Sequence, residues 1–246
     1  MESKAVYYLV SLNQKFQRGL KRKIIYIVLS LIFLLIHSSS SGQKQKPKND
    51  SSYDDKLLHF GFSLGVNTMD FNITPSRFSL DSTYFYPEVS KLMPGINIQI
   101  VTNLRAGKYF DIRFLPGLSF GQRNIRFYQV DPKKTPVLVD LTQLESSFLE
   151  FPLLLKFKGD RLNNVRPYVI GGLNYRYDLA KENDDIKLKR SDLYYELGAG
   201  LFFYLTYFKL SVELKMSNGI GNVLKEAAPY MEKMKSQIWV LAFHFE

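Results

Sequence analysis

Opposite charges stand two positions apart inside apolar segments of this chain. Asp111 is followed by Arg113, and Glu213 is followed by Lys215, each with one residue in between. Side chains two positions apart lie on the same face of a β-strand. A buried charge is stable only when it is paired and hydrogen-bonded, so this spacing indicates ion pairs on an enclosed face of strands. The residues predicted to form this structural network are Asp111, Arg113, Glu150, Lys156, Arg176, Glu196, Glu213 and Lys215.

Residue types that carry catalysis or bind metals are scarce. The chain has no cysteine and three histidines, of which His59 and His244 fall in the first and last apolar segments without a third ligand at metal spacing. It has no G-x-S-x-G, H-E-x-x-H or G-x-x-x-x-G-K-[ST] motif. The glycines of GAG (198–200) and NGIGN (218–222) fit a strand and a loop better than a phosphate-binding loop. We therefore expect no enzymatic activity, catalytic residue, cofactor or metal ion.

Eight segments alternate apolar and polar residues with a period of two, which predicts β-strands. They are residues 57–71, 95–104, 109–122, 146–158, 167–178, 192–205, 208–217 and 238–246. No segment with a helical period of comparable strength competes with them. The chain is therefore predicted to be all-β.

The two faces of these strands differ in a way that favours a membrane. One face is large and aromatic, in a chain with 19 Phe and 16 Tyr, and the other carries glycine, serine, asparagine and charge. A lipid-facing apolar belt around a polar interior is typical of outer-membrane barrels, in which closure leaves no free strand edge. We therefore predict an eight-stranded antiparallel transmembrane β-barrel over residues 57–246. A soluble secreted β-barrel, with the apolar face inside, is the alternative.

The predicted connections alternate in length. Short ones lie at 105–108, 159–165 and 205–207, and long ones at 72–94, 131–145, 179–190 and 218–235. Short periplasmic turns and longer outer loops are expected of this architecture, so both barrel termini are predicted to be periplasmic. Residues 224–235 have some helical character and are expected either to contact a partner or to cap the barrel mouth.

The first 42 residues have the composition of a targeting signal. A basic stretch precedes the apolar run IIYIVLSLIFLLI (24–36), and small polar residues follow it, which indicates a cleaved signal peptide with an extended n-region at 1–42. The run is shorter than the roughly 20 residues of a spanning helix, so a retained anchor is the weaker alternative. Residues 43–56 are polar and are expected to form a flexible periplasmic leader.

Cleavage of the signal would remove much of the positive charge. Six of the 33 basic residues and one of the 23 acidic residues lie in residues 1–42, so the net charge falls from +10 to +5. This lower net charge removes most of the argument for nucleic-acid binding. The predicted location is the outer membrane, with lipid as the first partner and no small-molecule substrate.

An eight-stranded barrel is narrow enough for its side chains to fill the lumen. We therefore expect the charged residues to form a plug of ion pairs, with a conducting pore as the alternative. Pro152 stands inside the segment SSFLEFPLLLKFK (146–158) and cannot donate to a ladder. A bulge or a weakened ladder is expected at this proline.

Four segments resemble the PorT family of Bacteroidota outer-membrane barrels. They are FLEFPLLLKFK, RPYVIGGLNYRYD, DLYYELGAGLFFYL and LSVELKMSNGIGN, and the match extends from about Leu57 to Glu246. The acid-x-Pro-Leu-Leu-x-Lys signature is shared with broader relatives, whereas S-x-G-x-x-N ending at Asn222 is closer to PorT itself. One departure is that Glu246 follows Phe245, where many outer-membrane barrels end on an aromatic residue.

The resemblance implies a component of type IX protein secretion, which exports proteins with C-terminal signals and supports gliding motility in some species. It implies an accessory or assembly factor that contacts other envelope secretion proteins, and it transfers no catalytic residue. The alternatives are a stand-alone adhesion or envelope-stabilising barrel and a small outer-membrane enzyme. Such enzymes need a Ser/His or Asp/His pair near the outer rim, whereas His59 and His244 are expected at the periplasmic side.

Overall fold

The computed structural model describes the strands and most of their connections. The described residues are 49, 56–75, 79–80, 83–89, 93–130, 137–180, 186–225 and 231–246, and all of them belong to one compact unit, residues 47–246. The predicted signal peptide (1–42) lies outside the described residues. So does the predicted leader (43–56), apart from Asn49 and Lys56.

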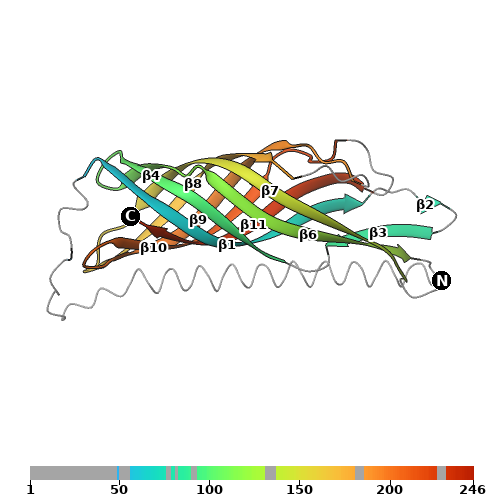
Figure 1. Ribbon diagram of the computed structural model, residues 1–246, viewed down its shortest axis with the longest axis horizontal. Helices are drawn as coiled ribbons and strands as arrows, with labels where there is room; N and C mark the ends of the chain where they lie inside the picture. Colours follow the sequence, from blue (N-terminus) through green and yellow to red (C-terminus); the bar gives the residue numbers. More distant parts are fainter. Residues whose placement is uncertain are drawn as a thin grey trace. The chain divides into compact units, whose positions relative to one another are not determined.

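The described residues form eleven strands in one antiparallel sheet (Figure 1). The strands are β1 (Leu58–Pro75), β2 (Ser79–Leu80), β3 (Thr83–Val89), β4 (Pro94–Arg105), β5 (Phe110–Phe114), β6 (Gly117–Val130), β7 (Val137–Lys158), β8 (Val165–Asp178), β9 (Ser191–Tyr204), β10 (Lys209–Gly219) and β11 (Met231–Phe245). The order is β1-β11-β10-β9-β8-β7-β5-β4-β6-β3-β2, and pairing of β1 with β4 closes the sheet into a barrel.

The barrel has eight staves, because β5 and β6 occupy one position between β4 and β7. All eight predicted segments lie in these staves, and the predicted eight-stranded antiparallel barrel is confirmed. The short predicted turns are confirmed as well, since residues 106–109, 159–164 and 205–208 join neighbouring staves. The described residues include no helix of the length and apolar character needed to cross a bilayer.

The prolines explain why the third stave is broken. Leu115 and Pro116 separate β5 from β6, and Pro152 of β7 lies opposite, where Leu115 N–H donates to its carbonyl at 3.1 Å. The register of β7 is the same on both sides of the break, since Phe114 faces Leu153 and Gly117 faces Glu150. On the side of β5 and β6 the ladder is interrupted opposite Pro152 without a bulge, as expected of a weakened ladder. On the side of β8 the expectation was wrong, because the ladder runs through Pro152 without a shift.

Outward side chains form an apolar belt around the lower part of the barrel, the part nearest the short turns. Leu153, Leu197 and Leu214 expose 56%, 55% and 54% of their surface, values that a soluble core would not leave open. Inward neighbours on the same strands are buried and polar, as in β5, where Asp111 and Arg113 are buried between exposed apolar residues. This is the sense of alternation that the sequence predicts for a membrane barrel.

The sense of the alternation reverses above the belt. On β6, Leu118 and Phe120 point outward inside the belt, but beyond it Arg126 points outward and Ile125 is fully buried. On β11, Lys235 is exposed while Met234 is fully buried. The upper part of the barrel therefore has a polar outside and an apolar inside, as expected for strands surrounded by water.

Three predictions for the loops were wrong, because parts of these segments belong to strands above the belt. Residues 137–145, predicted as loop, belong to β7, and residues 231–235, predicted as loop with helical character, belong to β11. The predicted long connection 72–94 contains β2 and β3, and β3 pairs with β6 above the end of β4. The reversal of polarity at the rim is the reason, because the apolar face that marks the strands moves from the outside to the inside there.

Side chains cap the backbone where ladders end above the belt. Asp70 accepts the N–H of Phe71 at 2.7 Å on β1, and Asn222 Oδ1 accepts the N–H of Met234 at 3.0 Å. Burial raises the pKa of the Asp70 carboxyl above its ordinary value, because desolvation of the charged form outweighs this hydrogen bond. These caps satisfy donors that would otherwise be left at open strand edges.

Candidate functional site

The centre of the lumen holds a fully buried network of four charges. Arg176 of β8 lies between two carboxylates, with Nε 3.0 Å from Glu150 Oε1 and Nη2 3.1 Å from Glu196 Oε1. Lys215 of β10 places Nζ 2.9 Å from Glu196 Oε2. The two cations and two anions therefore balance each other across β7, β8, β9 and β10.

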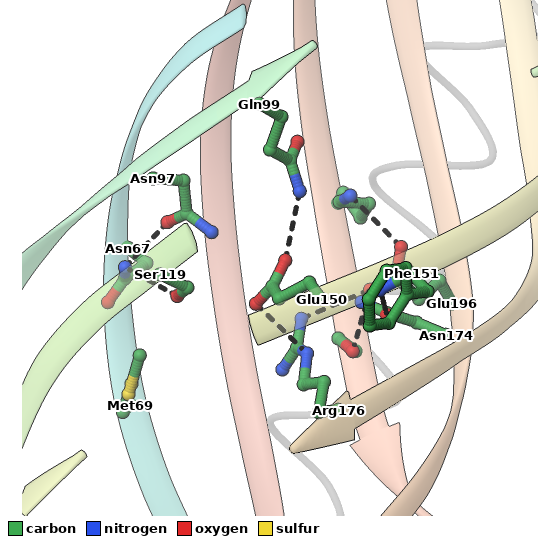
Figure 2. A network of polar contacts seen from close by, with 12 residues as sticks. Asn67, Met69, Asn97, Gln99, Ser119, Glu150, Phe151, Asn174, Arg176 and Glu196 are labelled. Carbon is green, nitrogen blue, oxygen red and sulfur yellow. Dashed lines mark hydrogen bonds and ion pairs between the residues drawn. The ribbon is translucent and has the colours of Figure 1, made fainter. Parts of the chain in front are cut away.

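Neutral side chains add hydrogen bonds to these carboxylates (Figure 2). Gln99 Nε2 donates to Glu150 Oε2 at 2.9 Å, and Asn174 Nδ2 donates to Glu196 Oε1 at 2.8 Å. Ser217 Oγ also lies 3.0 Å from Glu196 Oε1. A carboxylate that accepts several hydrogen bonds tolerates burial, which explains how Glu150 and Glu196 are accommodated here.

A second cluster lies nearer the chain end. Arg113 Nη1 contacts Glu213 Oε2 at 3.0 Å, and its Nη2 contacts Glu246 Oε1 at 2.8 Å. Lys209 Nζ approaches Glu246 Oε2 at 2.6 Å, and Tyr168 donates its hydroxyl to Glu213 Oε2 at 2.8 Å. The side chain of Glu246 is completely buried. Glu246, which departs from the aromatic ending of many outer-membrane barrels, therefore adds an acid to the lumen network.

Asp111 and Lys156 both lie inside the barrel but are not paired with the predicted partners. Asp111 accepts from Lys158 Nζ at 2.5 Å. Lys156 Nζ donates to Asn103 Oδ1 at 3.1 Å, and the ring centroids of Tyr168 and Phe202 lie 5.1 and 4.6 Å away. Aromatic faces stabilise a desolvated ammonium, which explains how this lysine is accommodated without a carboxylate contact.

The two histidines do not form a common site. His244 lies on β11 opposite Ser63 of β1, four residues along the strand from His59. His244 Nε2 is 3.4 Å from Glu213 Oε1. Within the described part of the chain, no group of three or more His, Asp or Glu side chains is arranged to hold a metal ion.

Sequence reasoning missed Glu246, Lys209 and Lys158 as members of the network. The signal was present, because His244 and Glu246 are two apart and alternation places both on the inner face. Lys158 follows Lys156 by the same rule. Which of these charged residues pair with one another depends on the register between strands. The alternation along a single strand does not reveal that register.

Apolar side chains fill the lumen between and above the charged clusters. Below the centre, a buried cluster contains Val101, Leu115, Leu154, Tyr168, Ile170, Phe202 and Tyr204. Above it, a second cluster contains Phe71, Ile125, Leu144, Ile186, Val223, Leu224, Met231 and Met234. Leu188 and Leu224 form an antiparallel bridge between the segments that precede β9 and β11. The lumen is thus occupied by side chains at its centre and below the upper rim.

The comparison with known families agrees with this barrel geometry. A model of the family described as "Outer membrane protein beta-barrel domain" matches residues 42–225. No curated protein matches the chain significantly.

Several solved outer-membrane proteins are similar in structure. The outer membrane protein OprG from Pseudomonas aeruginosa is 13% identical, with 82% of this chain and 98% of that chain covered and a TM-score of 0.41. Ail, the attachment invasion locus protein of Yersinia pestis, is 15% identical, with 77% and 98% covered and a TM-score of 0.35. Neisserial surface protein A is 11% identical, with 77% and 99% covered and a TM-score of 0.41.

Proposed function

This chain belongs to the outer membrane protein beta-barrel domain family. We propose that it is a non-enzymatic component of type IX protein secretion. In this role it is an accessory or assembly factor for the export of proteins with C-terminal signals, and it contributes to gliding motility. It resides in the outer membrane, which is the location of its family.

The observation that carries the proposal is the filled lumen. Arg176, Glu150 and Glu196 are fully buried at its centre, and apolar clusters lie on both sides of them. A barrel of this kind acts on other proteins through its outer surface, its rim and its turns. This property agrees with an accessory role and disfavours a conduit for exported chains.

The resemblance to the PorT family adds the assignment to secretion. Its acid-x-Pro-Leu-Leu-x-Lys segment supplies Glu150 to the buried network, and its S-x-G-x-x-N segment forms the end of β10 and the start of the connection that follows. Gly221 N–H, beyond the end of β10, donates to Asp192 Oδ1 at 3.2 Å, and a Cβ at Gly219, the last residue of β10, would lie 2.6 Å from Asp192 Oδ2. Both segments are therefore used to build the barrel and its rim.

Deletion of the gene tests the proposed function. We expect the deletion strain to retain proteins with C-terminal signals in the cell, and a plasmid copy of the wild-type gene to restore their export. Immunoblots of culture medium and cell fractions measure both. Normal export in the deletion strain would contradict the secretion role and would favour the stand-alone adhesion or envelope-stabilising barrel.

The proposed orientation places both barrel termini in the periplasm, and the absence of cysteine makes it testable by labelling. Tyr207, in the turn between β9 and β10, exposes 95% of its surface, and Lys233 is exposed on upper β11. With a maleimide too large to cross the outer membrane, we expect intact cells to label the Lys233→Cys variant. The Tyr207→Cys variant should react only after permeabilisation, and the reverse pattern would overturn the orientation.

A further inference from the structure

A groove on the outward face of the barrel lies where β10 and β11 separate. The ladder between these strands ends at the pair Asn218 and Gln237, whereas β10 stays paired with β9 through Gly219. The groove has a volume of about 310 Å³, within the range of pockets that bind small ligands. Its lining includes the polar side chains of Asn72, Tyr195, Asn218, Lys235 and Gln237.

The groove lies at the upper edge of the apolar belt. On the outward face of β11, Trp239 belongs to the belt, whereas Gln237 and Lys235 above it are polar. Tyr195 of β9 lines the groove and is 43% exposed. Outward tyrosine and tryptophan side chains concentrate at the level of the lipid headgroups. The groove therefore opens at headgroup depth, directly above apolar surface on which acyl chains lie.

The polar side chains of the groove are available to a ligand. Lys235 is exposed and forms no ion pair with a described residue. The side-chain amides of Asn72 and Asn218 have no hydrogen-bond partner in the part of the chain that the structure describes. Gln237 Nε2 contacts the sulfur of Met216 at 3.7 Å, which is a weak interaction. One ammonium and three amides therefore line the groove with donors and acceptors to offer.

The two acids close to the groove are held by the backbone outside its lining. Asp70 of β1 accepts the N–H of Phe71 through Oδ1 at 2.7 Å. Asp192 of β9 lines the cavity on the lumen side, and its Oδ1 accepts the N–H of Gly221 at 3.2 Å. The charge in the lining itself is therefore the positive charge of Lys235.

We propose that the groove binds the headgroup of one lipid, a phosphorylated sugar, whose acyl chains lie on the belt below. The Lys235 ammonium pairs with the phosphate, and the three amides bind the hydroxyl groups of the sugar. One cation beside three amides fits a phosphate on a hydroxyl-rich group better than a phosphate alone. In the proposed orientation the occupant is a glycolipid of the outer leaflet. This inference goes beyond the role in secretion and does not depend on it.

Quenching of Trp239 fluorescence tests the proposal, because this single tryptophan lies on the belt directly below the groove. The wild-type protein is reconstituted in vesicles of phosphatidylcholine with brominated chains, which quench a tryptophan that they contact. An unbrominated glucosamine lipid that carries a phosphate is then added in steps. We expect it to displace the brominated lipid beside Trp239 with about tenfold preference, the gain from a charge-assisted hydrogen bond. Exchange in proportion to the mole fractions would overturn the proposal.

Matched variants and ligands identify the groups responsible for this preference. The Lys235→Gln variant, or the same lipid without its phosphate, should lower the preference several-fold. The Lys189→Gln variant should keep it, because Lys189 is an exposed cation that does not line the groove. An unchanged preference in the Lys235→Gln variant would contradict the site. Free glucosamine phosphate in excess should leave the wild-type preference unchanged, and its loss would mean that a soluble sugar phosphate, not a lipid, occupies the groove.

Discussion

The Glu196→Ala variant is expected to be less stable than the wild type by about 3–5 kcal/mol, the cost of breaking a buried ion pair by removing one partner. Glu196 is fully buried and accepts from Arg176, Lys215 and Asn174 at 2.8 to 3.1 Å. Its loss leaves Arg176 with Glu150 as its remaining ion-pair partner and takes from Lys215 the carboxylate that it contacts. Urea titration in lipid vesicles measures the change, with the fluorescence of Trp239, the single tryptophan of the chain, as the signal.

Two further variants separate this effect from a general loss of negative charge. The Glu145→Ala variant removes an exposed acid on the upper part of β7 and should leave the urea midpoint almost unchanged. Adding Lys215→Met to Glu196→Ala removes one stranded cation and should recover part of the lost stability, since neighbouring sites are not additive. A Glu196→Ala barrel as stable as the wild type would mean that the lumen charges are hydrated rather than paired.

An arginine on the apolar belt is expected to have the second large effect. Leu214 lies near the middle of the outward face of β10, opposite Leu241 of β11 and Ala199 of β9, and it is 54% exposed. The Leu214→Arg variant places a charge near the bilayer midplane, where it should cost about 2–4 kcal/mol of folding free energy. Refolding into vesicles, followed by urea titration, measures the loss.

The matched control lies on the same strand at the edge of the belt. Asn218 points outward four residues from Leu214, so the Asn218→Arg variant should cost only about 0–1 kcal/mol. Equal costs at the two positions would show that the exposed apolar residues do not contact lipid.

The period of the sequence predicted the staves of the barrel because lipid imposes one sense of alternation over the whole belt. Above the belt the surroundings change to water. The apolar residues there, such as Met234 and Ile125, lie on the inward face instead of the outward face. A rule that follows one apolar face therefore ends the strand at the rim. This is why the upper parts of β7 and β11 were predicted as loops.

The network shows a second limit of the sequence. Alternation placed Asp111, Lys156 and Arg176 on the inner face, where the structure has them. Which side chains meet depends on the register and tilt of the strands, which a single sequence does not contain. Lys158 therefore reaches Asp111, while Lys156 lies between aromatic rings.

Current recording in planar lipid bilayers tests the central claim, a barrel that is closed by its own side chains and acts through its surface. We predict that the purified wild-type protein inserts without stable conductance steps, because the ion pairs and apolar clusters fill the lumen. The Glu196→Ala variant provides the comparison, since a disrupted network is the condition under which a passage would open. Stable open channels of nanosiemens scale in the wild-type protein would contradict the account.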